Sequence, residues 1–200
     1  MNKKKNMNLI YGFLIIMIIV ALTGASGIPY GVRLLEVLKM YDIETGLLVS
    51  KPAEKVIRHE SDKNIIEIKN LATKVYSADD LGSEINSGSH PFESLVIVPC
   101  SMKTLSSIAN GYSNNSISRV ADVALKEGRK TIIVPRETPL RTVHLENMVK
   151  LSKEGATILP AMPAFYNKPE SLDDNLDFIV GKILDLLNIN NDLYQRWQGE

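Results

Sequence analysis

The chain has 200 residues, a length that suits a single domain of ordinary size. Its 23 lysine and arginine residues balance its 23 aspartates and glutamates, so the formal net charge is zero and neither nucleic-acid binding nor an acidic tail is indicated. The one cysteine, Cys100, excludes an internal disulfide and two-cysteine metal motifs, and this usage fits a cytoplasmic protein.

The N-terminus permits two interpretations. Lysines at positions 3–5 precede an apolar run over residues 9–22, and small residues follow, which is typical of a signal peptide. The run is short for a membrane span, which needs about 20 apolar residues. Alternatively, residues 18–22 form a buried parallel strand that leads into a glycine turn at 23–27, which cleavage there would destroy. The N-terminus alone leaves both interpretations open.

Downstream of that turn, strand-like apolar runs alternate with amphipathic, helix-like segments. The spacing predicts a helix from Pro29 to about Met40, a strand at Thr45–Val49 and a helix at Lys51–Arg58. Residues 61–92 give a weaker pattern, in which a short strand is centred on Val75.

The second half of the chain has a sharper pattern. Three strand-like runs, each followed by a proline, lie at 95–98, 131–134 and 157–159. Helix-like segments lie at 102–110, 117–127, 143–154 and, after a cap at Ser171, about 172–187. The alternation predicts an α/β fold, namely a doubly wound, Rossmann-like or flavodoxin-like three-layer domain with a mostly parallel sheet and right-handed crossovers.

In such folds, ligands bind beyond the carboxyl ends of the strands. Five segments occupy these positions, and four of them place a charged residue or a hydroxyl beside proline or glycine: 23–27, 50–51, 99–103, 135–137 and 160–166. This clustering places the candidate ligand site at that edge of the sheet.

The glycine turn indicates a phosphate-bearing ligand, although tight packing alone would also explain it. Glycines at 24, 27 and 31 permit close backbone approach, and amides at the start of the next helix can cradle an anion. The dinucleotide fingerprint G-x-G-x-x-G is absent, and the second strand ends in Ser50-Lys51 where an acidic residue would bind a ribose. We therefore infer a mononucleotide.

Six ordered motifs resemble the UbiX family of flavin prenyltransferases over roughly residues 17–197. They are ALTGASG at 21–27, VPCSMKT at 98–104, RVADVALK at 119–126, VPRETPL at 134–140, HLENM at 144–148 and LPAMPAFY at 159–166. Members of this family commonly begin close to Met17, which favours the strand interpretation. The resemblance implies a poorly ordered or loosely packed extension at 1–16, one FMN-binding domain at 17–188, and a tail at 189–200 that contributes to a site or a subunit contact.

The resemblance also implies an activity. Family members join a dimethylallyl group from dimethylallyl monophosphate to reduced FMN and close a fourth ring. The product, prenylated FMN, is the cofactor of UbiD-type decarboxylases. We expect no metal, no nucleic acid, no stable membrane insertion, a cytoplasmic location, and a homododecamer of trimers with sites at subunit contacts.

The same motifs assign FMN contacts to small and polar residues near the strand ends: Gly24, Ala25, Ser26, Ser50, Ser101, Met102, Lys103, Thr104, Arg119 and Arg136. Ser26 matches a serine beside the reactive flavin nitrogen, where a hydroxyl can relay a proton. Without the motif, Ser26 would be interpreted as a helix cap, and Ser101 is equally compatible with ordinary capping.

The prenyl phosphate requires groups that stabilise a leaving anion. By resemblance, Tyr166 and Lys182 hold it, and Lys126 belongs to the same set of anion-handling residues. Relatives often carry arginine at position 182, and lysine there keeps the charge but loses bidentate geometry. A lysine at 126 or 182 is also typical of a solvated helix face.

Two acids and one tryptophan complete the assignment. Glu60 and Glu137 match family acids, and Glu137 is the better candidate for the base that removes the ring proton; its alternative role is a salt bridge to Arg136. Trp197 matches a tryptophan near the prenyl pocket, or else packs the tail at a subunit contact. We expect Cys100 to be buried and inert.

Two rival functions remain open. A flavin-dependent cysteine decarboxylase of the phosphopantothenoylcysteine type shares the flavoprotein fold, but it carries Pro-Ala-Met-Asn and Pro-Ala-Ser-Ala-Asn stretches. This chain has PAMP at 160–163 and PCSMK at 99–103. A membrane-tethered, non-enzymatic protein is the other rival, motivated by residues 3–22.

Overall fold

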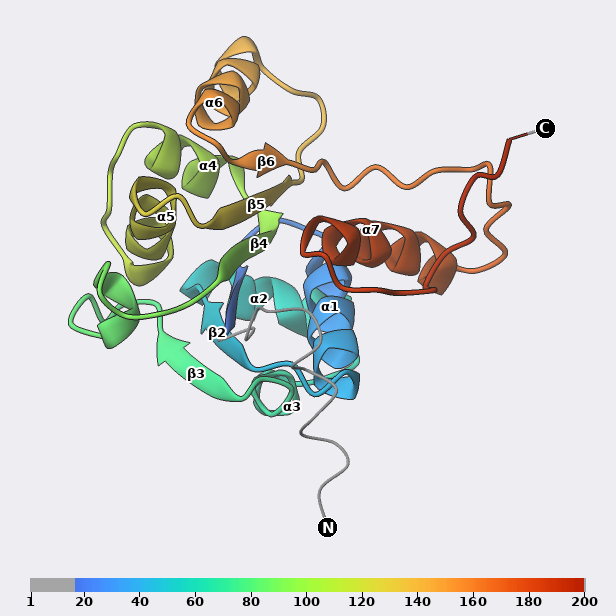
Figure 1. The fold of residues 1–200 in the computed structure, drawn as a ribbon, viewed down its shortest axis with the longest axis horizontal. Coiled ribbons are helices and arrows are strands. Elements are labelled where there is room, and N and C mark those ends of the chain that lie inside the picture. The colour runs from blue at the N-terminus through green and yellow to red at the C-terminus, as the bar shows by residue number, and fades with distance from the viewer. Residues whose placement is uncertain (1–16, 200) are drawn as a thin grey trace.

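The strands of the computed structural model, which describes residues 17–199, form one parallel sheet in the order β3-β2-β1-β4-β5-β6 (Figure 1). They are β1 (Ile18–Leu22), β2 (Thr45–Val49), β3 (Lys74–Ser77), β4 (Ser94–Cys100), β5 (Lys130–Pro135) and β6 (Thr157–Ile158). This is the Rossmann strand order, in which the chain starts at the centre, builds one half of the sheet and then crosses to build the other. The predicted fold class is confirmed.

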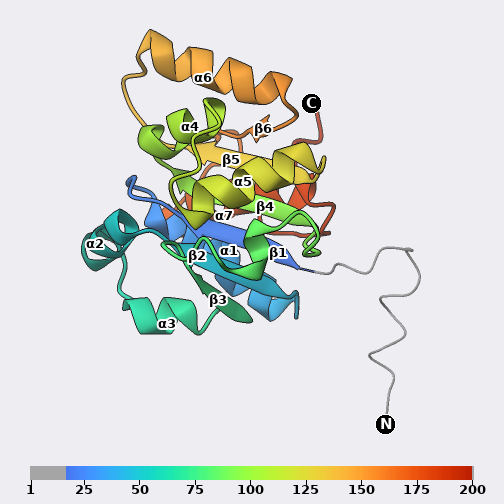
Figure 2. The same cartoon turned by 90° about the vertical axis from the view of Figure 1, so that its left-hand side faces the viewer.

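Helices cover both faces of this sheet (Figures 1 and 2). One face carries α1 (Ile28–Met40), α2 (Lys51–Glu60), α3 (Ile65–Lys69) and α7 (Leu172–Leu186). The other face carries α4 (Met102–Ala109), α5 (Ser116–Lys126) and α6 (Thr142–Lys153), together with a short 3-10 turn, η1 (Glu84–Asn86). The sheet is therefore the middle layer of three.

Strand β1 shows why its sequence is apolar throughout. Ile18, Val20 and Leu22 pack into the core beneath α1 and α7, whereas Ile19 and Ala21 pack into the core beneath α4 and α5. A strand covered on both faces has no side that water can solvate. The strand interpretation of residues 18–22 is confirmed, while the prediction made for residues 1–16 lies outside the described residues.

The predicted elements are found within one or two residues of their expected ends, whereas helix α3 was not predicted. This helix has only five residues, too few for a helical repeat of apolar side chains to stand out. Its one sequence signal is a capping box, in which the Asn64 side chain accepts from the Glu67 amide and the Glu67 carboxylate accepts from the Asn64 amide. Within residues 17–199, no helix is both long enough and apolar enough to cross a membrane.

Candidate functional site

The carboxyl ends of β1 and β4 are tied together by one buried threonine. The Thr23 amide and hydroxyl both donate to the Pro99 carbonyl, at 3.3 and 2.7 Å, and the Ser101 amide donates back to the hydroxyl at 2.8 Å. These strands flank the point where the strand order reverses, which is where doubly wound sheets bind ligands. Thr23 therefore fixes the geometry of the two loops that leave this point.

A cavity of about 390 Å³ opens beside these loops, a size within the usual range for small-molecule sites. Five of the predicted FMN-contacting residues line it: Gly24, Ser50, Ser101, Lys103 and Thr104. The structure thus brings together residues that are up to 80 positions apart in the sequence. Of the other predicted contacts, Ala25 is buried and Met102 packs against the core below α4 and α5.

The lining of this cavity suits an anionic ligand. The Ser50 hydroxyl caps α2 by accepting from the Ala53 amide at 3.2 Å, and the Ser101 hydroxyl caps α4 by accepting from the Thr104 amide at 3.4 Å. Two helix N-termini with serine hydroxyls therefore border one space, and such termini favour phosphate. The exposed Lys103 adds a positive charge.

Gly24 lets the chain pass close to α2. A Cβ atom at this position would lie 2.4 Å from Cβ of Pro52, so no other residue fits without a shift of the helix start. The close approach that the sequence predicted is therefore between two segments of protein, and it forms one wall of the cavity.

Several residues that line the cavity were missed from the sequence. Lys51 and Asp79 form an ion pair of 2.7 Å between Nζ and Oδ2 at its rim, and this pair raises the pKa of Lys51. Asn115 caps α5 and also lines the cavity. An Asn-Asn-Ser run before a helix predicts an N-cap, but it does not show that the capping residue lies at the cavity beyond β1 and β4. Only the folded structure shows that.

Ser26 lies next to Arg136, which follows the end of β5. The Arg136 Nε donates to the Ser26 carbonyl at 3.0 Å, and its amide donates to the Cys100 carbonyl at 3.2 Å. Among the described residues, the Ser26 hydroxyl has no hydrogen-bond partner, so it is available to a ligand. Glu137 is exposed and accepts from the Thr138 amide at 3.1 Å, which differs from the alternative salt bridge to Arg136.

The start of α1 does not offer free amides to an anion, although the glycine turn had suggested that it would. The Gly27 and Ile28 amides, which could have cradled an anion, both donate to Oε2 of Glu60, at 2.7 and 3.1 Å. The Glu60 carboxylate reaches them from the end of α2 and neutralises the positive end of α1. Of the three helix starts at these strand ends, those of α2 and α4 therefore remain the candidates for an anion, and Glu60 holds the backbone that follows Ser26.

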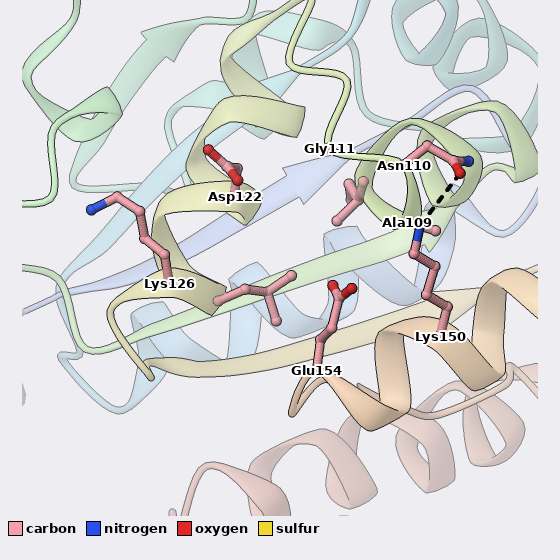
Figure 3. Close-up of a pocket in the computed structure, with 9 residues that line it drawn as sticks. Ala109, Asn110, Gly111, Asp122, Lys126, Lys150 and Glu154 are labelled. Carbon is pink, nitrogen blue, oxygen red and sulfur yellow. Dashed lines mark hydrogen bonds between the residues drawn. The ribbon is translucent and has the colours of Figure 1, made fainter.

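Lys126 and Arg119 face other surroundings. Lys126 ends α5 and pairs with Glu127. It therefore lies near the amino end of β5, whereas Arg136 follows the carboxyl end of that strand, which is roughly 20 Å long. Lys126 borders a second cavity of about 520 Å³ between α4, α5 and α6, where Lys150 donates to Asn110 (Figure 3). Arg119 pairs with Asp122 at 2.6 Å and donates to the Asn86 carbonyl at 3.2 Å.

Tyr166 and Trp197 form a separate ring pair on the segments that flank α7, the helix that carries Lys182. The Tyr166 and Trp197 rings meet edge to face, with centroids 5.6 Å apart, and Lys182 is exposed on α7. The segments that carry these rings extend outward past α7 (Figure 1). No hydrogen bond or ring contact within residues 17–199 links this group to Ser26.

Cys100 and His144 have the structural roles expected of them. Cys100 is completely buried, which raises the pKa of its thiol far above the usual value, and it has no route to a ligand. The His144 ring nitrogen accepts from the Arg141 amide at the start of α6. In the described part of the chain, no three His, Cys, Asp or Glu side chains are grouped to hold a metal ion.

Comparison with known proteins adds sequence and structural relatives. The family model described as Flavoprotein matches residues 14–185. The chain is 54% identical over 184 residues to the flavin prenyltransferase UbiX of Methanothermobacter thermautotrophicus, which covers 92% of this chain and 96% of that protein.

Two solved structures are similar over nearly the same length. AnUbiX in complex with FMN and dimethylallyl pyrophosphate has a TM-score of 0.90 and 42% identity, over 92% of this chain and 98% of that chain. The dodecameric FMN-dependent UbiX-like decarboxylase from Escherichia coli O157:H7 has a TM-score of 0.89 and 44% identity, over 92% and 100%.

Proposed function

The chain belongs to the UbiX family of flavin prenyltransferases, and we propose that it transfers a dimethylallyl group from dimethylallyl monophosphate to reduced FMN, giving prenylated FMN. The cavity at the carboxyl ends of β1 and β4 carries this proposal. It combines a ligand-sized space with two helix N-termini suited to a phosphate. Its wall at Gly24 belongs to the same turn as Ser26, whose carbonyl accepts from Arg136.

FMN fits the residues that line this cavity. We assign its phosphate to the hydroxyl-capped starts of α2 and α4, with Ser50, Ser101 and Thr104, and its ring system to the turn at Gly24–Ser26. Reduced FMN supplies a nucleophilic ring nitrogen, the prenyl donor supplies the five-carbon group, and inorganic phosphate leaves. Arg136 holds the backbone of the Ser26 turn through its carbonyl oxygen and so positions the residue that carries the hydroxyl.

Ser26 moves the proton in this proposal. A hydroxyl with no protein partner can accept from one neighbour and donate to another without breaking a bond of the fold. Glu137, exposed at the end of β5 one residue beyond Arg136, is the candidate base for ring closure. Glu60 acts through the backbone of the turn, because its carboxylate is committed to two amides of α1.

Tyr166, Lys182 and Trp197 form the candidate prenyl-phosphate half of the site. Lys182 and the Tyr166 hydroxyl offer a cation and a proton donor to a leaving phosphate, and the rings offer apolar contact to a dimethylallyl group. Because the segments before and after α7 extend outward from the sheet (Figure 1), and no contact within residues 17–199 links their rings to Ser26, we propose that these residues complete the site of a neighbouring copy. Lys126 and Arg119, at other places on the surface, would reach a site in the same way.

A site whose flavin half and prenyl-phosphate half come from different copies requires self-association. We propose that the chain forms a homododecamer, like the Escherichia coli relative, and that the product serves a UbiD-type decarboxylase. A cytoplasmic location suits an enzyme that uses reduced FMN, and fractionation of cells against a cytoplasmic marker tests it. The rival cysteine decarboxylase is not favoured, because the similar sequences are flavin prenyltransferases at about half identity.

Mass spectrometry tests the proposal. The purified protein is incubated without oxygen with reduced FMN and dimethylallyl monophosphate, and omission of the prenyl donor is the control. We expect FMN enlarged by one five-carbon unit, with release of inorganic phosphate. Bound FMN of unchanged mass, together with carbon dioxide release from phosphopantothenoylcysteine, would instead support the rival enzyme.

A further inference from the structure

The C-terminal tail, residues 189–199, turns back along α7 after the helix ends (Figure 1). It follows one face of the helix, because the Asn191 side chain donates to the Gly181 carbonyl at 3.4 Å and the Tyr194 ring lies directly over Gly181. This face comprises residues spaced by three, four and seven positions, which share one side of an α-helix: Phe178, Gly181, Lys182 and Asp185.

One carboxylate holds the tail in this path. Asp185 accepts from the Tyr194 hydroxyl at 2.7 Å, from Asn191 at 2.9 Å, and from both terminal nitrogens of Arg196 at 2.6 and 2.9 Å. A bidentate guanidinium with two further donors is a strong and directional arrangement. The Arg196 guanidinium and these donors lower the pKa of Asp185 to about 2.

A series of ring contacts connects Tyr194, which Asp185 holds, to Trp197. Tyr194 contacts Phe178 with centroids 5.1 Å apart, Phe178 contacts Tyr166 at 6.1 Å, and Tyr166 contacts Trp197 at 5.6 Å. All three contacts are edge to face, which aromatic pairs favour. The position of Trp197 therefore depends on where Tyr194 and Arg196 are held, which is at Asp185.

Gly181 makes this arrangement possible. A Cβ atom there would lie 2.5 and 2.7 Å from two carbons of the Tyr194 ring. The ring can reach Asp185 only because position 181 has no side chain. Lys182, the next residue, is exposed on the same face, one helical turn from both Phe178 and Asp185.

We propose that Asp185 is a positioning residue of the prenyl-phosphate half-site, which holds the tail across α7 so that Trp197 packs against Tyr166 at the helix face that carries Lys182. The inference rests on the proposed function, since it assumes that Tyr166 and Lys182 receive the prenyl phosphate. Asp185 itself touches no substrate in this proposal. Its loss should therefore weaken the prenyl donor and leave the flavin half of the site unchanged.

Steady-state kinetics with reduced FMN supplied at saturating concentration test this expectation. Asp185→Asn keeps the shape of the side chain but removes the charge, and should raise KM for dimethylallyl monophosphate on the order of tenfold. We expect kcat at saturating donor within about twofold of wild type, because a misplaced tail lowers affinity more than chemistry. The control Lys63→Gln removes another exposed ion pair, to Glu36 at 3.0 Å, and should change neither value.

A second variant reaches the same result without changing any charge. Gly181→Ala should displace Tyr194 and raise KM as Asp185→Asn does. Trp197 is the only tryptophan, so its fluorescence reports the tail directly. In both variants we expect stronger quenching by acrylamide than in wild type or Lys63→Gln.

Three results would overturn the inference. Stronger quenching with an unchanged KM would show that the tail does not position the half-site, and a raised KM with unchanged quenching would show that Asp185 acts by another route. A raised dissociation constant for FMN would show that the variants damage the fold. A wild-type chain that forms no prenylated FMN would instead overturn the proposed function and the role of Trp197 in it, while quenching would still decide whether Asp185 holds the tail.

Discussion

The flavin half and the prenyl-phosphate half of the proposed site are built in different ways. At the ends of β1 and β4, the backbone defines the space, with buried Thr23 joining the strands and Gly24 pressed against Pro52. At α7, exposed side chains define it, since Tyr166 and Trp197 are 42% and 63% exposed and one carboxylate holds the tail. The first half belongs to the core of the fold, and the second is attached to its surface.

This difference predicts two kinds of response to mutation. A change that fills the backbone-defined space of the flavin half should abolish FMN binding almost completely, because the backbone there cannot move without disturbing the sheet. A change in the prenyl half should raise KM moderately, because each exposed contact contributes only a small free energy. Variants that depart from this division would show where the comparison fails.

The largest effect is expected at Gly24. Gly24→Val should reduce FMN affinity by roughly a hundredfold or more, since its Cβ would overlap Pro52 and overpacking at such a site costs about 1–3 kcal/mol even before the cavity wall shifts. Titration of FMN by fluorescence measures this loss. Gly82→Val, at an exposed glycine near only the Asp80 carboxylate, is the matched control and should bind FMN normally.

A smaller and more selective effect is expected at Ser26. Ser26→Ala should slow formation of prenylated FMN by about 100-fold, the lower end of what general acid–base groups contribute, with FMN affinity within about threefold. Single-turnover mass measurement separates these two quantities. Ser152→Ala, on α6, is the control, and an equal loss of FMN binding in Ser26→Ala would reassign Ser26 to binding.

The smallest effect is expected from pH acting on the tail. The folded-state pKa of Asp185 is about 2, below its usual 3.8, so the stability that the attachment contributes is fully present above about pH 4 and is lost as the pH falls toward 2. At the other limit, burial raises the pKa of Tyr194 to about 12, so its hydroxyl keeps donating.

Trp197 quenching measured from about pH 2 to pH 9 checks this expectation. It should stay constant down to about pH 4 and rise below it, while Asp185→Asn should give strong quenching at every pH. A wild-type transition near neutral pH would contradict the assignment of Asp185 as the holding group.

The same contrast explains how much the sequence could predict. Gly24, Ser50 and Ser101 each follow an apolar strand, and parallel strands bring their carboxyl ends to one edge, so local patterns were enough to place them together. The hydroxyl of Thr23 and the carboxylate of Glu60 could not be assigned in this way, because their partners lie 76 to 78 and 32 to 33 positions away. No local pattern shows which acid will reach the start of α1.

The prenyl half was harder still. The motif containing Tyr166 and the tail containing Trp197 gave the residues, but not that Asp185 and Gly181 hold them in place. For Lys126, the motif predicted a place in the same site as Tyr166 and Lys182, but the fold puts this residue at the end of α5, near the amino ends of the strands. In the proposed function, an assembly of several copies brings these positions to one reaction.

A complementation measurement tests that division most directly. Chains carrying Ser26→Ala and chains carrying Tyr166→Phe are co-expressed with different tags, and oligomers that contain both are purified. If the flavin and prenyl halves come from different copies, random mixing restores about a quarter of the sites, and product appears well above the level of either variant alone. If mixed oligomers form no more prenylated FMN than the separate variants, each chain builds its own complete site and the account is wrong.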